Sequence, residues 1–232
     1  MESTRCLGLI GGLGVGATVH YYARLAEGCE QLGQTLDIII TNAYTPRVFA
    51  YVEAKDRRGL AAYLNAYIGR MRDAGAELAV VPAVTPHYAI EDLIGISPLP
   101  IVSIFDPLRR ELARRGIRRV AIFGTRFVIE SDLFGALAGV EIVLPRPDEI
   151  DLIHKTYVEL AAAGKGSVEK RDLLTAVASA LVHREGVESI LLAGTDLTLI
   201  FDENTAEFPC VDCAAAHIQE TLQRIVRSRG AS

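Results

Sequence analysis

Short apolar runs alternate with amphipathic, helix-period segments along the whole chain of 232 residues, and this alternation limits the possible folds more than any other feature. Several runs are continuously apolar, which is typical of parallel strands buried on both faces. The strand candidates are residues 7–10, 36–41, 78–81, 101–104, 120–123, 140–144, 189–192 and 210–211. The helix candidates are residues 17–32, 57–74, 107–115, 149–163, 170–184 and 214–229. Alternation of this kind predicts an α/β fold with parallel sheets.

A weak internal repeat suggests two similar lobes. The run TRCLGLIGGLG, which contains Gly11, resembles IRRVAIFGTRF, which contains Gly124. GAELAVVPAVT, with Ala83, resembles GVESILLAGTD, with Gly194, at a similar separation of nearly half the chain. Ligands of open parallel sheets bind beyond the carboxyl ends of the strands, so two facing lobes would line one cleft with four strand-end turns. The alternative explanation of the repeat is that βα units generally look alike, without a duplication of the lobe.

Composition and charge limit the partners that the chain can have. The formal net charge is -5 at pH 7 and no basic stripe is present, which argues against nucleic acid. The first residues lack the basic segment and long apolar run of a signal peptide. No apolar run approaches the ~20 residues of a membrane helix, so no membrane partner is expected. These features predict a cytoplasmic protein.

The four cysteines include one C-x-x-C pair, Cys210 and Cys213. A structural zinc site normally needs a second pair of ligands, which the sequence does not show, so we expect no metal. The strand-like context also differs from a thioredoxin motif, which opens a helix. One interpretation is that these thiols are buried and inert. The alternative is that Cys213 is a free thiol near a cleft.

The stretch GLIGGLGVGAT contains a glycine-rich turn after the first strand candidate. Gly12, Gly14 and Ala17 match G-x-G-x-x-A, a fingerprint of dinucleotide binding. That fingerprint also needs an acidic residue at the end of the second strand, where this chain has Asn42. A turn that holds a small carboxylate at a helix N-terminus explains the same residues and is favoured here.

The sequence also resembles a known family. GLIGGLGVGAT is similar to the G-G-M-G-P-x-A-T opening of the aspartate/glutamate racemase superfamily. Further similar segments follow in family order over nearly the whole chain, namely TNAYTPR, AVTPH, FGTRFVIESDLF, PDEIDLIHKTYVEL, ILLAGTDL and PCVDCAAAHI. The resemblance implies a homodimer whose subunits have two pseudosymmetric α/β lobes, each a parallel sheet flanked by helices, with an active-site cleft between them. Residues 1–105 and 212–232, including a returning C-terminal helix, would form lobe 1, and residues 106–211 would form lobe 2.

The mechanism that the resemblance implies needs no cofactor. Two thiols, one in a C-N-T motif and one in a G-C-T-E motif, remove and return the proton α to a carboxylate from opposite faces. In this chain the positions of the missing family cysteines hold Ala83 and Gly194. Neither residue can exchange a proton, so the usual two-cysteine racemisation is not expected.

Other positions of the family pattern are kept. The resemblance implies that Arg47 and Lys155 hold carboxylate groups, the first in bidentate fashion and the second as a point charge. Thr85, Thr125 and Thr195 would supply hydroxyl and backbone donors to a second carboxylate. Each of these residues has an alternative role, as a solvated surface charge or as a helix-capping threonine.

Three titratable residues near the expected cleft are candidates for altered catalysis. Asp196 replaces the usual glutamate, and Cys213 replaces a threonine of the family pattern. His87 is the third candidate, because a histidine at a helix start can donate a proton. Asp196 could instead hold a backbone turn, and His87 could instead act as a cap.

Two functions from different classes fit these residues. In the first, the chain is an enzyme of amino acid metabolism. It would be either a racemase-like isomerase or a decarboxylase, isomerase or lyase of the same superfamily. It would act on a small amino or dicarboxylic acid by cofactor-independent proton transfer. In the second, it binds a carboxylate without turnover. A nucleotide-binding module is a third and weaker possibility.

Overall fold

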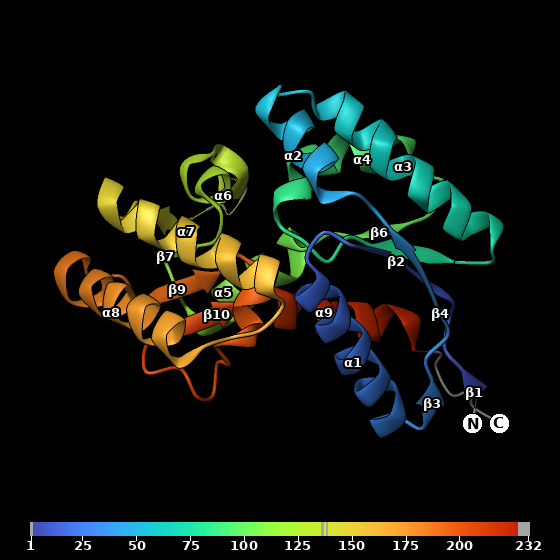
Figure 1. Cartoon of the computed structure of the whole chain (residues 1–232). Coiled ribbons are helices and arrows are strands. Elements are labelled where there is room, and N and C mark those ends of the chain that lie inside the picture. Colours follow the sequence, from blue (N-terminus) through green and yellow to red (C-terminus); the bar gives the residue numbers. More distant parts are fainter. Residues whose placement is uncertain (1, 136, 138, 227–232) are drawn as a thin grey trace.

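The computed structural model describes residues 2–135, 137 and 139–226, and Figure 1 shows them as two lobes, each built around a sheet. The strands are β1 (Glu2–Ser3), β2 (Leu7–Gly11), β3 (Gln34–Thr35), β4 (Ile38–Asn42), β5 (Leu78–Val80), β6 (Ile101–Val102), β7 (Arg119–Phe123), β8 (Glu141–Ile142), β9 (Ser189–Leu192) and β10 (Cys210–Asp212). The α-helices are α1 (Val15–Gln31), α2 (Thr45–Glu53), α3 (Arg57–Asp73), α4 (Ile90–Ile96), α5 (Phe105–Arg115), α6 (Arg126–Glu130), α7 (Pro147–Ala163), α8 (Val168–Glu185) and α9 (Cys213–Ile225). Short 3-10 helices are η1 (Thr85–Ala89), η2 (Asp132–Phe134) and η3 (Thr195–Leu199).

The two main sheets have the same strand order. The first runs β4-β2-β5-β6, and the second runs β8-β7-β9-β10 when read from its β8 edge. Strands β1 and β3 form a small additional ladder, and the described strand pairs are parallel. The α/β class with two sheet-bearing lobes is therefore confirmed. The matching order is also what the internal repeat predicts, since it equates β2 with β7 and β5 with β9.

Helices cover both faces of the first sheet (Figure 1). Successive side chains of a strand point to opposite faces, so Leu9 and Ile10 of β2 enter different cores. Leu9 packs in one cluster with Leu25 of α1 and Ile218 of α9. Ile10 packs in another cluster with Leu64 of α3. Helix α9 thus follows the last strand of the second sheet but packs on the first, which ties the two lobes together.

The second sheet has one large core. Ile122 of β7 and Leu191 of β9 are almost fully buried in it, with Leu108 of α5, Ile153 of α7 and Leu181 of α8. Burial of this kind is the main source of stability for a parallel sheet, because its strands have no polar face to offer to water. The strands therefore form a rigid base from which the strand-end turns project.

The structure differs from the sequence-based prediction mainly at short elements. Helices α2 and α4 were not predicted, and the strand expected at residues 140–144 is reduced to Glu141–Ile142. The helix expected at residues 214–229 ends at Ile225, and residues 227–229 lie outside the described part of the chain. None of the helices in the described part has the length and apolar content needed to cross a bilayer.

Candidate functional site

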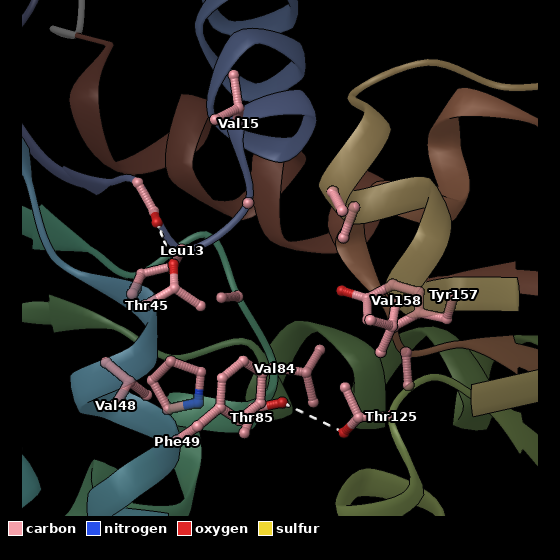
Figure 2. A pocket seen from close by; sticks show the side chains of 17 residues that line it. Leu13, Val15, Thr45, Val48, Phe49, Val84, Thr85, Thr125, Tyr157 and Val158 are labelled. Carbon is pink, nitrogen blue, oxygen red and sulfur yellow. Dashed lines mark hydrogen bonds between the residues drawn. The ribbon is translucent and has the colours of Figure 1, made fainter. Parts of the chain in front are cut away.

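A pocket of about 350 Å³ opens between the lobes, beyond the carboxyl ends of β2, β5, β7 and β9 (Figure 2). The turns after these four strands, the start of α1 and one face each of α2 and α7 form its walls. The lining residues are Gly12, Leu13, Gly14, Val15, Thr45, Val48, Phe49, Ala83, Val84, Thr85, Pro86, Thr125, Tyr157, Val158, Ala161, Ala162 and Ala193. Four strand-end turns therefore meet at one cleft, as expected for facing α/β lobes.

The side chains of the pocket wall are apolar apart from four hydroxyl groups. These belong to Thr45, Thr85, Thr125 and Tyr157. None of the lining residues that the structure describes carries a charged side chain. A wall of this kind favours an apolar group in the ligand, and the few hydroxyls are the side-chain groups that can orient a polar one.

Thr85 and Thr125 face each other across the cleft, with their hydroxyl oxygens 3.5 Å apart (Figure 2). Thr125 also accepts a hydrogen bond from the backbone N–H of Val128 and so caps α6. Each hydroxyl has one proton, and only one of the two protons can lie between the two oxygens. The other proton is left for a ligand, so a carboxylate contact, which the sequence predicts for both residues, is geometrically possible here.

The hydroxyls of Thr45 and Thr195 are used within the protein. Thr45 donates to the carbonyl oxygen of Gly12, which holds α2 against the glycine-rich turn. Thr195 is buried and donates to the carbonyl oxygen of Pro82 at 3.1 Å. Gly12, a predicted ligand contact, lines the pocket, whereas Thr195, also predicted, does not. Thr195 instead connects the strand-end turns of the two lobes.

Asp196 is fully buried behind the glycine-rich turn and links the lobes. Its Oδ1 accepts a hydrogen bond from the backbone N–H of Ala17 at 3.0 Å, and its Oδ2 accepts one from the Tyr157 hydroxyl at 3.4 Å. A carboxylate at the start of α1 also interacts favourably with the helix dipole. Burial raises the pKa of Asp196, while these two donors lower it. The contacts match the alternative role considered for Asp196, which is to hold a backbone turn.

This contact explains the glycine at position 14. Gly14 has φ +155°, and a Cβ there would lie 3.1 Å from Cγ of Asp196 and still closer to one of its oxygens. Only glycine combines this backbone angle with so close an approach. The carboxylate of Asp196 thus shapes the glycine-rich turn. Asp196 and Ala17, whose backbone N–H donates to this carboxylate, are 179 residues apart in the chain.

Tyr157 covers the position of the second missing cysteine. Ala83 lines the pocket, but Gly194 lies behind the Tyr157 ring. A Cβ atom at residue 194 would lie 2.6 Å from Cδ2 and 2.8 Å from Cζ of that ring, much closer than non-bonded carbon atoms approach. Any larger residue at position 194 therefore requires the ring to move. Burial raises the pKa of the Tyr157 phenol, and the nearby Asp196 carboxylate raises it further.

His87 is buried beneath the turn that follows β5. Its Nδ1 lies 2.8 Å from the carbonyl oxygen of Ala83, and its Nε2 lies 3.1 Å from the backbone nitrogen of Ile104. A carbonyl only accepts and an N–H only donates, so the neutral tautomer with its proton on Nδ1 satisfies both contacts. Burial, together with the neighbouring His217, lowers the pKa of His87 to about 3. Both ring nitrogens are thus occupied, and His87 does not line the pocket.

Cys213 is fully buried at the first position of α9, in the core of the second lobe. Burial raises the pKa of its thiol, and Asp212 raises it further. Because Cys213 does not line the pocket, these surroundings match the interpretation of a buried, inert thiol.

Arg47 does not line the pocket. On α2 the pocket face consists of Thr45, Val48 and Phe49, with spacing i, i+3 and i+4. Arg47 lies on another face of the helix, is exposed, and has its Cζ 5.0 Å from the ring centre of Tyr63. This stacking gives the guanidinium an aromatic partner on α3.

Lys155 also lies outside the pocket wall. It is exposed on α7, one turn before the lining residue Val158. The two predicted carboxylate-binding cations are therefore not brought together, whereas Thr85, Thr125 and Gly12 are.

The pocket residues of α2 and α7 were not predicted from the sequence. Pro46 follows Thr45 at the start of α2, and a proline in the first turn is a signal for a helix start that would have predicted this element. Tyr157 and Ala161 lie four residues apart, so the helical period places them on one face of α7. The period alone does not indicate that this face meets the other lobe.

Known proteins share both this sequence pattern and this fold. The profile of the Asp/Glu/Hydantoin racemase family matches residues 10–221. The structure is similar to that of a protein from Yersinia pestis assigned to the Asp/Glu racemases, with a TM-score of 0.80 and 26% identity, over 96% of this chain and 98% of the other.

Two further structures show the same fold at lower identity. An aspartate racemase homologue from Pyrococcus horikoshii OT3 has a TM-score of 0.79 and 24% identity, over 94% of this chain and 98% of the other. Glutamate racemase from Thermus thermophilus has a TM-score of 0.64 and 18% identity, over 96% of this chain and 81% of the other. The profile match covers most of the sequence, and the chain therefore belongs to the Asp/Glu/Hydantoin racemase family.

Proposed function

We propose that this chain binds a small carboxylic acid in the pocket between its lobes and does not invert it by a two-thiol route. The observation that carries the proposal is the pair of positions at which family resemblance places the thiols. One holds Ala83, and the other holds Gly194 beneath the ring of Tyr157. Stereo-inversion needs a base on each face of the substrate carbon, and neither residue can act as one.

A carboxylate ligand is supported by the paired hydroxyls and by the family to which the chain belongs. Thr85 and Thr125 leave one hydroxyl proton free to donate into the pocket. The acids named for similar structures, aspartate and glutamate, are themselves carboxylic acids. In the proposed complex one carboxylate oxygen of the ligand accepts from this hydroxyl pair.

One-sided proton transfer by Asp196, His87 or Cys213 draws no support from the arrangement, because none of the three lines the pocket. Tyr157 does line it, but its phenol already donates to Asp196, and its pKa is raised by burial and by that carboxylate. A phenol with a raised pKa is a poor base near neutral pH. Binding without turnover therefore fits the site better than catalysis.

The test combines a binding measurement with an exchange measurement. A panel of amino, dicarboxylic and monocarboxylic acids is titrated by calorimetry, and each acid is then incubated with the protein in D₂O and followed by proton NMR. We expect saturable binding of at least one acid and no loss of its α-proton signal beyond the buffer rate. Exchange of the α-proton that depends on the protein would overturn the proposal of binding without turnover. Absence of binding by every acid would overturn the proposed carboxylate site.

A variant pair locates the binding. Thr85→Val removes one hydroxyl without changing the side-chain size and should weaken binding about tenfold, the loss expected for a hydrogen bond to a charged group. Thr205→Val is the matched control, because Thr205 is exposed and does not line the pocket. Equal affinity of both variants would show that the Thr85 hydroxyl does not hold the ligand.

A further inference from the structure

We propose that the pocket selects a monocarboxylic acid with an apolar side group over an amino acid or a dicarboxylic acid. This inference rests on the proposed carboxylate binding and adds the class of the ligand. It follows from what the pocket offers to each part of a bound acid.

Apart from the four hydroxyl-bearing residues, the side chains that line the pocket are apolar. Leu13, Val48, Val84 and Ala161 line it, and Val48 and Val84 are buried. At the mouth, Val15 is 66% exposed, so the apolar surface reaches the solvent. An apolar group entering the pocket would remove both its own surface and this wall from water.

The wall offers no counter-charge to a second ionic group. An ammonium or a second carboxylate inside would lose its hydration and meet apolar side chains and neutral hydroxyls. The carboxylate of Asp196 lies behind Gly14 and already accepts two hydrogen bonds. Of the nearby cations, Arg47 stacks on Tyr63, and Arg126 is paired with Glu130 and Asp151. Lys155 is exposed on α7 and does not line the pocket.

Tyr157 closes the pocket on the side of the missing second thiol. Its ring fills the space above Gly194, and Ala193 and Val158 complete the same wall. This side is therefore shaped as a surface for an apolar group. One carboxylate at the Thr85–Thr125 pair and one apolar group against this wall match the two kinds of side chain that line the pocket.

Matched pairs of acids test the selection by titration calorimetry. 4-Methylpentanoate and leucine differ by an α-ammonium group, and pentanoate and glutarate have the same number of carbons but differ by a second carboxylate. We expect each monocarboxylate to bind at least about tenfold more tightly than the partner that carries a second charged group, because a buried unpaired charge is costly. Leucine or glutarate binding as tightly as its partner would overturn this inference and leave the proposed carboxylate binding intact.

A neutral analogue separates the inference from the proposed function. 4-Methylpentan-1-ol has the apolar group without the carboxylate, and we expect it to bind at least about tenfold more weakly than 4-methylpentanoate. Equal binding would overturn the carboxylate contact, and absence of binding by all five compounds would overturn both proposals.

A charge added at the mouth should reverse the selection. Val158 is 42% exposed and lines the pocket, so Val158→Arg places a guanidinium there without burying it. We expect glutarate to gain at least about tenfold in affinity relative to pentanoate. Val168→Arg is the matched control, since Val168 is 65% exposed at the start of α8 and does not line the pocket. Equal preference in both variants would contradict the inference.

Discussion

The contact between Gly194 and the Tyr157 ring makes a quantitative prediction about stability. Gly194 has φ -116° and ψ 111°, an extended conformation that alanine adopts without strain. In such a place Gly→Ala stabilises a protein by about 0.4–1 kcal/mol through the unfolded state. Here the added Cβ would overlap with the Tyr157 ring. Overpacking of this kind costs about 1–3 kcal/mol, so we expect Gly194→Ala to be destabilising by about 1–2 kcal/mol.

Removal of the ring should reverse the sign of that effect. In a Tyr157→Ala background the overlap is absent, and Gly194→Ala should become neutral or stabilising by up to about 1 kcal/mol. Urea unfolding of the four proteins of this double-mutant cycle, followed by circular dichroism, measures the coupling. We expect a coupling energy of about 1–3 kcal/mol between the two positions.

Gly69→Ala is the control for this cycle. Gly69 lies inside α3, and apart from its chain neighbours and the backbone of its own helix no described atom lies within 4 Å of the place where its Cβ would be. The substitution should stabilise the helix by about 0.5–1 kcal/mol in both backgrounds. If Gly194→Ala has the same effect with and without the Tyr157 ring, then the ring does not occupy the position of the second thiol, and the reasoning is refuted.

Three other predictions concern groups around the pocket. Burial lowers the pKa of His87 to about 3 from 6.5 in the unfolded chain, so the folded state disfavours its charged form. The contribution of His87 to the free energy of unfolding is therefore complete above pH 6.5, and it falls by about 2 kcal/mol between pH 7 and pH 5. Urea titrations should show a flatter pH dependence for His87→Gln, and an unchanged slope would contradict this. Asp196→Ala leaves the donors of Ala17 and Tyr157 without their acceptor and should lower the free energy of unfolding by about 1–3 kcal/mol. Asp196→Asn keeps an acceptor and should cost less. Equal losses of stability in urea unfolding would show that the hydrogen bonds are unimportant. Arg47→Ala should leave ligand affinity within about twofold in calorimetry, because Arg47 is outside the pocket wall; a larger loss would restore the role that family resemblance implies.

The regular elements could be read from the sequence because they depend on local patterns. Residues 189–192 were predicted as a strand and form β9 with the same bounds. Its three consecutive apolar residues, Ile190 to Leu192, have few alternatives once the neighbouring segments are helical. The short helix α2 was missed, since nine residues offer little periodicity and its start lies within a stretch that reads as a loop.

The candidate site could be read only in part. The four strand-end turns were expected at one cleft, and the pocket contains residues from each of them. The directions of single side chains were not predictable in this way. Arg47 shares a helix with Thr45 but points away from the pocket, and Lys155 lies one turn before the lining residue Val158. Such directions depend on how each helix is rotated about its axis, which distant packing contacts determine.

The sequence by itself determined the α/β class, the family and the absence of thiols at positions 83 and 194, because these depend on residue identity and order along the chain. Only the tertiary structure decided what occupies the space of the second thiol. Tyr157 reaches Gly194 from a helix, and Asp196 reaches the start of α1 from the other lobe. Both contacts join residues that are far apart in the chain, and they exist because the folded sheets bring their strand ends together.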